Sequence, residues 1–328
     1  ADLEDEIDGL LDGLDDPDSP DQRKAASPTR KAQATSAYGD ICTGVCLGSA
    51  EEQGNRPSME DRYVARERFF PSNLSSKISS TRAICGVFDG HSGSMVSDFA
   101  AERLPELLER EPWFKDANKC ENDLMKKSLE NSFVRLDEEI LARTSQGVLA
   151  GGSTANVALV VDGWLHCANL GDARAVLSRG GHAMPLSVDH KPDVEAEKSR
   201  IENASGKVEW RGCWRVMTNN GGAPRGLAVS RAFGDMDWKV PNMLVESAPD
   251  VMSVELNRRD EFVIVGCDGV WDVLQNQDAV DIARSHLTAD RTGSDAAAKA
   301  AAQEIASRAL ELGSQDNVTV VVMGFVWA

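Results

Sequence analysis

The stretch that decides the fold is Val87-Phe88-Asp89-Gly90-His91-Ser92-Gly93. It closes the short apolar run 84–88, which is typical of a buried strand, and the run ends in Asp-Gly. A carboxylate in this position lies on the rim of a hydrophobic core, and the glycine leaves the backbone free to bend. A single Asp-Gly pair usually marks only a turn, because it is among the commonest turn dipeptides.

The same pattern recurs elsewhere in the chain. Asp268 follows the apolar run 262–267, Asp316 precedes the β-branched run 318–325, and Glu60-Asp61 opens an early strand. Several carboxylates at one rim repel one another unless cations lie between them. Oxygen ligands suit Mg²⁺ and Mn²⁺, and two such ions can activate water against a phosphate ester. The recurrence therefore indicates metal-dependent chemistry on phosphate esters.

The remaining pattern predicts helices in pairs between blocks of strands, and not a regular βαβ repeat. Amphipathic helices are expected over 96–108, 125–140, 279–287 and 296–312, and strands over 154–161, 164–169 and 173–178. Asp162-Gly163 joins the first two of these strands as a hairpin signal. Gly171-Asp172 joins the second strand to the third.

Composition limits the partners and the compartment. The 328 residues carry 53 acidic and 35 basic side chains, a net charge of −18, which argues against nucleic acid and anionic lipid as partners. No apolar stretch is long enough to span a membrane, and no secretory signal is visible. The seven cysteines are scattered without a C-x-x-C pair, as reduced thiols would be. We expect an intracellular protein, cytoplasmic or nuclear, and a monomer.

The N-terminal segment differs from the rest of the chain. Residues 1–36 form an acidic extension in which Leu3, Ile7, Leu10, Leu11 and Leu14 mark one face of an amphipathic helix. We expect this helix to pack on the body of the protein, and residues 37–328 to form the catalytic domain.

Seven stretches, in order, resemble the motifs of the metal-dependent serine/threonine protein phosphatases of type 2C. They are residues 56–61, 87–93 (VFDGHSG), 152–155 (GSTA), 168–175 (ANLGDARA), 227–235 (LAVSRAFGD), 260–273 (DEFVIVGCDGVWDV) and 314–320 (SQDNVTV). No single stretch decides the matter, but the ordered set is specific and covers about residues 38–326. The resemblance implies an α+β fold, a central sandwich of two antiparallel β-sheets flanked by pairs of α-helices. It also implies hydrolysis of phosphoserine and phosphothreonine in phosphoprotein substrates.

The resemblance implies a site for two Mn²⁺ or Mg²⁺ ions. Asp89 would bridge both ions. Asp268 and Asp316 would hold one of them, and Glu60 and the backbone carbonyl of Gly90 would serve the other.

Further roles follow from the same resemblance. Asp61 would orient a metal-bound water, Arg56 would bind the substrate phosphate, and His91 would protonate the leaving serine or threonine oxygen. Asp172 and Asp272 match positions that help to form a weaker third metal site in some members.

The chain departs from the family pattern in the flap, at about residues 187–226, which flanks the substrate cleft in the family. The run 219–224 (NNGGAP) is looser than usual. Trp210, Trp214 and Trp238 cluster around it, either as the flap's own small core or partly facing substrate.

Other functions are weighed against this one. A cysteine phosphatase is excluded, because no arginine lies six residues after any cysteine. An inactive family member acting as a binding module would have lost metal carboxylates, and all of those expected are present. A hydrolase of small phosphoesters alone remains open.

Overall fold

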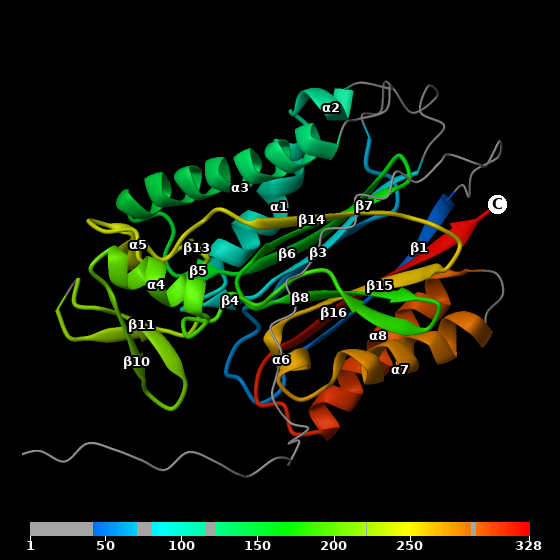
Figure 1. The fold of residues 1–328 in the computed structure, drawn as a ribbon. Helices are drawn as coiled ribbons and strands as arrows, with labels where there is room; N and C mark the ends of the chain where they lie inside the picture. Colours follow the sequence, from blue (N-terminus) through cyan, green and yellow to red (C-terminus); the bar gives the residue numbers. More distant parts are fainter. Residues whose placement is uncertain (1–41, 71–80, 116–121, 221, 290–292) are drawn as a thin grey trace, which may run out of the picture. The chain divides into compact units, whose positions relative to one another are not determined.

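The computed structural model describes residues 42–70, 81–115, 122–220, 222–289 and 293–328. Two five-stranded antiparallel sheets form its centre (Figure 1). The predicted N-terminal extension, residues 1–36, lies outside the described residues, so its helix and the boundary at residue 37 stay predictions.

Each sheet combines strands from distant parts of the sequence. The first sheet runs in the order β1 (Cys42–Glu52), β16 (Val318–Trp327), β15 (Asp260–Gly266), β8 (Arg174–Arg179) and β9 (His182–Pro185). The second runs in the order β14 (Asp250–Glu255), β7 (Trp164–Leu170), β6 (Ala155–Val161), β3 (Arg82–Phe88) and β2 (Arg62–Arg66). The predicted sandwich of two antiparallel sheets is confirmed.

The strand that carries the deciding motif is buried on both faces. Ala83, Cys85 and Val87 of β3 belong to the core between the sheets. Ile84 and Phe88 belong to a second core, on the outer face of the same sheet. Alternate side chains of a strand point to opposite faces, so a strand buried on both faces is apolar throughout.

Pairs of helices cover the outer faces of the sandwich (Figure 1). α1 (Met95–Leu108) and α3 (Asn122–Ser145) pack on the second sheet. α7 (Asn276–Ala289) and α8 (Asp295–Glu311) pack on the first. All four helices were predicted from their apolar periodicity, and all four are confirmed. None of the helices among the described residues is long and apolar enough to cross a membrane.

The two predicted strand connections turn out differently. Asp162-Gly163 forms the expected hairpin between β6 and β7, with φ angles of 53° and 86°. Gly171-Asp172 forms no hairpin, because β7 lies in the second sheet and β8 in the first. The chain crosses between the sheets at this point, so Asp172 lies at the rim of the sandwich.

The flap region is built from short elements outside the two main sheets. These are α4 (Glu195–Asn203), β10 (Lys207–Trp210), β11 (Trp214–Thr218), β12 (Arg225–Leu227) and α5 (Met236–Lys239). A separate small core joins them and includes Ile201, Val216, Trp238, Leu244 and Val245. This core extends beyond residue 226, the end predicted for the flap.

Of the three flap tryptophans, one lies in the flap's own core. Trp238 is buried in the small core, and its indole nitrogen donates to the Val216 carbonyl over 2.8 Å. Trp210 and Trp214 are 61% and 36% exposed and stack edge to face, with ring centroids 5.6 Å apart. Only Trp238 therefore belongs to the flap's core.

Three remaining pieces are short. The strands β4 (Gly90–His91), β5 (Gly152–Ser153) and β13 (Phe233–Gly234) form a small sheet next to the deciding motif. The one-turn helix α6 (Asp268–Trp271) follows β15, and the one-turn helix α2 (Pro112–Lys115) follows α1.

Candidate active site and metal centre

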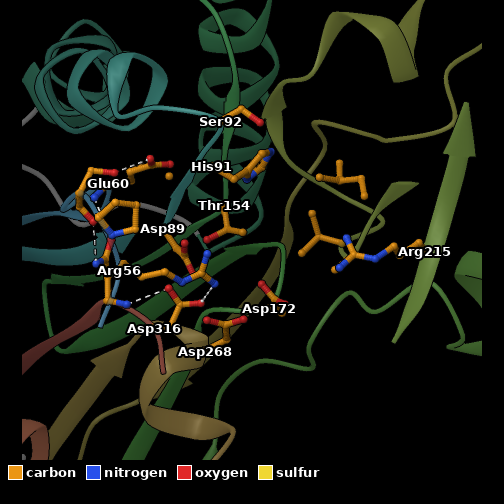
Figure 2. A pocket seen from close by; sticks show the side chains of 17 residues that line it. Arg56, Glu60, Asp89, His91, Ser92, Thr154, Asp172, Arg215, Asp268 and Asp316 are labelled. Carbon is orange, nitrogen blue, oxygen red and sulfur yellow. Dashed lines mark hydrogen bonds and ion pairs between the residues drawn. The ribbon is translucent and has the colours of Figure 1, made fainter. Parts of the chain in front are cut away.

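Eight of the ten residues predicted for the site line a single cleft of about 320 Å³. They are Arg56, Glu60, Asp89, Gly90, His91, Asp172, Asp268 and Asp316 (Figure 2). The other two are Asp61, which is 1% exposed, and Asp272, which is exposed at the end of α6. The structure thus brings together residues that span most of the described chain.

Strand ends explain this convergence. Asp89 follows β3, and Asp172 follows β7, which runs in the same direction as β3 in the second sheet. Asp268 follows β15, and Asp316 precedes its antiparallel partner β16 in the first sheet. The four carboxylates therefore lie at the same edge of the sandwich, two from each sheet.

Three of these carboxylates form the tightest oxygen cluster. Asp89, Asp172 and Asp268 each offer an oxygen within 4.8 Å of the others (Figure 2). Burial, followed by the charges of Asp61 and Asp268, raises the pKa of Asp89 well above its ordinary value. Burial and the neighbouring carboxylates also raise the pKa of Asp268. Asp172 is buried, and Asp89 and Asp268 are half-buried. An all-oxygen cluster that resists ionisation by itself fits a hard divalent cation such as Mg²⁺ or Mn²⁺.

Asp316 lies in the same cleft, paired with an arginine. Its Oδ2 atom is 2.5 Å from Nη2 of Arg56, and its Oδ1 atom accepts from the Asn317 backbone over 2.7 Å. Burial raises the pKa of Asp61 to about 6, and repulsion by Asp316 acts in the same direction. Arg56 is half exposed, and its guanidinium lines the cleft beside Asp316 (Figure 2).

The loop that carries Glu60 is fixed on several sides. Its carboxylate accepts from the Gly93 backbone over 2.9 Å and from the Ser58 hydroxyl over 2.8 Å. Its backbone N–H donates to the Asn317 side chain over 2.8 Å. A Cβ atom at Gly90 would lie 2.4 Å from the Glu60 carbonyl oxygen. Only glycine allows this close approach, which brings the two predicted metal residues together.

His91 is held by a residue to which sequence reasoning assigned no role. Its Nε2 atom is 2.8 Å from Oδ2 of Asp235, whose side chain is 3% exposed. Burial disfavours the imidazolium, but the charge and hydrogen bond of Asp235 outweigh burial and raise the pKa of His91. Asp235 has a left-handed backbone, φ +50°, at the start of α5. Asp235 is the last residue of the stretch LAVSRAFGD, which matches a family motif. The sequence alone does not show that Asp235 contacts His91.

Comparison with known proteins gives the family. A sequence model described as "PP2C: Protein phosphatase 2C" matches residues 46–318. This chain belongs to the protein phosphatase 2C family.

Curated relatives agree with this assignment. "Protein phosphatase 2C 56" of Arabidopsis thaliana is 38% identical over 299 residues, 82% of this chain and 66% of the relative. "Probable protein phosphatase 2C 52" of Oryza sativa subsp. japonica is 36% identical over 85% of this chain and 50% of the relative. This chain therefore spans about half to two thirds of the length of these two curated relatives.

Solved structures share the fold. A serine-threonine phosphatase 2C from Toxoplasma gondii superposes with a TM-score of 0.74 at 24% identity, covering 86% of this chain and 95% of that chain. A C. elegans sex determining protein superposes with a TM-score of 0.70 at 26% identity, covering 86% of this chain and 65% of that chain. The protein phosphatase 2C fold thus accounts for the two-sheet sandwich and its paired helices.

A lysine near the cleft also escaped sequence reasoning. Lys191 makes an ion pair with Oδ2 of Asp172. Burial disfavours its charged form, but Asp172, Asp268 and Asp272 outweigh burial and hold the pKa of Lys191 above its ordinary value. A lysine at position 191 gives no sign in the sequence that it pairs with Asp172, a carboxylate 19 residues earlier in the chain.

Arg215 and Thr154 are among the other residues that border the cleft of this phosphatase 2C member. Arg215 reaches it from β11 of the flap (Figure 2), and its Nη1 atom donates to the Gly226 carbonyl over 3.1 Å. Thr154 lines the cleft next to Asp89, to whose carbonyl its backbone N–H donates over 2.9 Å. His190 is structural: its ring accepts from the Gly171 backbone over 3.1 Å and lies 3.2 Å from Asp250.

Proposed function

We propose that this chain hydrolyses phosphoserine and phosphothreonine in proteins, with divalent cations held by the strand-end carboxylates. The observation that carries the proposal is the convergence of Asp89, Asp172 and Asp268 with Arg56 and His91 in one cleft. Membership of the protein phosphatase 2C family supports it. Asp316, Glu60 and the Gly90 carbonyl complete the proposed ligand set, and Asp272 lies beside it.

The proposed role of the metal ions is to activate water and to neutralise the phosphate. Bound at these carboxylates, two Mn²⁺ or Mg²⁺ ions would supply positive charge for the phosphate and lower the pKa of a water molecule that attacks phosphorus. The family resemblance implies that Asp89 would hold both ions, and one of its carboxylate oxygens lies in the cluster with Asp172 and Asp268.

The chain's own residues perform the remaining tasks. Arg56, which lines the cleft, binds the phosphate oxygens through its planar fork of N–H donors. Asp61, buried beside Asp89 and Asp316, accepts a hydrogen bond from the attacking water and orients it. His91 donates a proton to the serine or threonine oxygen as the P–O bond breaks. Asp235 holds the imidazole ring in place for that transfer.

The proposal also covers the substrate class, the cellular location and the oligomeric state. A net charge of −18 without a basic run disfavours nucleic acid as a substrate. The seven cysteines are scattered without a C-x-x-C pair, which supports an intracellular location, in the cytoplasm or nucleus. We propose that the chain acts there as a monomer on phosphoprotein substrates.

A matched pair of variants tests the proposal. Asp89→Asn should abolish both Mn²⁺ binding and turnover of a phosphoserine peptide, because it removes a charge from the centre of the cluster. Asp278→Asn removes the same charge from an exposed position in the first turn of α7, so it should leave both unchanged. Full turnover by Asp89→Asn would contradict the proposed mechanism. Faster turnover of nucleotides than of phosphopeptides would favour the small-phosphoester alternative.

A further inference from the structure

A buried ion pair lies next to the loop that carries Asp235. It joins Asp137, on α3, to Lys239, the last residue of α5, and the two side chains are 3% and 1% exposed. Oδ2 of Asp137 lies 2.6 Å from Nζ of Lys239. Burial lowers the pKa of Lys239, although the charge of Asp137 opposes this. Taking two charges out of water is costly, and apolar side chains often replace such a pair without loss, so stability alone does not explain it.

The pair fixes the chain on both sides of Asp235. Oδ1 of Asp137 accepts from the Gly234 backbone N–H over 2.8 Å. Nζ of Lys239 donates to the Ala232 carbonyl over 2.7 Å as well as to Oδ2 of Asp137. Asp235 lies between Gly234 and Lys239 in the sequence, so one carboxylate on α3 holds the loop before and after it.

Asp235 and His91 meet in a space that tolerates little displacement. A Cβ atom at Gly152 would lie 2.3 Å from Oδ2 of Asp235 and 2.4 Å from Nε2 of His91. The strand β5, which carries Gly152, pairs with β13 on one side and with β4 on the other. The left-handed backbone of Asp235 is one that few residues other than glycine adopt unless their surroundings hold it. A shift of the Asp235 loop would therefore change the position of the His91 ring.

We propose that the Asp137–Lys239 ion pair positions His91 for proton transfer by fixing the loop that carries Asp235. This inference rests on the proposed function. Neither member of the pair is among the described residues that line the cleft, so both are positioning residues that do not touch the substrate. Loss of the pair should slow only the step that needs the His91 proton, the breaking of the P–O bond to serine or threonine. Metal binding should not change, because the pair is no part of the carboxylate cluster.

Kinetics of Asp137→Asn in the full chain, at saturating Mn²⁺, test this inference. We expect kcat on phosphoserine peptide to fall about 10- to 100-fold, because a small displacement of a positioned acid has an effect of this size. On p-nitrophenyl phosphate kcat should stay within about twofold of the wild type, since p-nitrophenolate leaves without a proton. Mn²⁺ affinity, measured by calorimetry, should be unchanged.

Combination with His91→Gln separates positioning from a general loss of structure. In that background Asp137→Asn should cause little further loss on phosphoserine peptide, because residues that act through one group have non-additive effects. Asp260→Asn is the matched control: it neutralises another buried carboxylate that pairs with an arginine, at the start of β15, and should leave the ratio of the two kcat values unchanged.

A second variant covers the case in which Asp137→Asn does not fold, as checked by thermal melting. The double substitution Asp137→Leu with Lys239→Met removes both charges together, so it leaves no unpaired charge in the core. It also removes the acceptor of the Gly234 N–H, and it should show the same selective loss on phosphoserine peptide.

The outcomes separate this inference from the proposed function. Equal losses on the two substrates, or a loss that adds in full to that of His91→Gln, would make the pair purely structural and overturn the inference while leaving the phosphatase proposal intact. Unchanged kcat on both substrates would overturn it as well. No turnover of phosphoserine peptide by the wild type with Mn²⁺ would overturn the proposed function, and this inference with it.

Discussion

Replacement of His91 by Gln separates leaving-group chemistry from assembly of the site. A serine alkoxide is a poor leaving group and needs a proton, whereas p-nitrophenolate leaves without one. A positioned general acid contributes roughly 10²–10⁴-fold, or about 3–5 kcal/mol of barrier. The 2.8 Å contact between His91 and buried Asp235 fixes the ring, so the loss should reach at least the middle of that range. We therefore expect kcat on phosphoserine peptide to fall about 10³-fold, and kcat on p-nitrophenyl phosphate to fall much less.

The assay compares kcat for the two substrates at saturating Mn²⁺. His182→Gln, at an exposed position in β9, is the matched control and should behave as the wild type on both. Asp235→Asn should show the same substrate dependence as His91→Gln but a smaller loss, because the imidazole remains. Equal losses of His91→Gln on both substrates, with normal Mn²⁺ binding, would refute the assignment of His91 as the leaving-group acid.

The remaining predictions concern substrate binding and stability. Arg56→Ala should raise KM for both substrates, measured by initial rates, because both present the same phosphate; an effect on only one would contradict this. Lys239→Met should cost about 3–5 kcal/mol in urea unfolding at pH 7, since it leaves Asp137 charged and buried without its 2.6 Å partner; a loss under 1 kcal/mol would contradict it. Burial lowers the pKa of His166 to about 4. The unfolded chain thus binds this proton first, and on the order of 3 kcal/mol of stability should be lost as the pH falls from about 6.5 to 4. His166→Gln should remove that part of the pH dependence.

Individual helices and strands could be predicted from the sequence. The apolar run that ends at Asp89 predicts a strand buried on both faces, and β3 has that environment. The spacing of Met125, Leu129, Phe133 and Leu136 predicts the buried face of α3. These patterns depend only on residues close together in the chain, and strand and helix periods determine them directly.

Pairing between strands that are distant in the sequence could not be predicted in the same way. The strand β1 was missed, because its burial alternates unevenly and its partner β16 lies at the other end of the chain. The pair Gly171-Asp172 resembles a hairpin turn locally, and only the placement of β8 in the other sheet makes it a crossover. Pairing between distant segments depends on tertiary packing, of which a single sequence carries no direct record.

The candidate site shows the same division. Asp89 and Asp268 were found because each carboxylate follows an apolar run and precedes a glycine. Asp235 and Lys191 were missed because each meets its partner, His91 or Asp172, across the tertiary structure. Their roles depend on distances, and residue type alone does not supply a distance.

We propose that divalent cations held by the strand-end carboxylates make this chain a phosphoserine phosphatase. The most direct measurement is the initial rate of phosphate release from a phosphoserine peptide by chelator-treated protein, as Mn²⁺ is titrated from zero. Oxygen-only sites bind these ions loosely enough for a chelator to remove them. We predict no turnover without added metal, a saturable rise with Mn²⁺, and a similar rise with Mg²⁺. Undiminished turnover in excess EDTA would contradict the account.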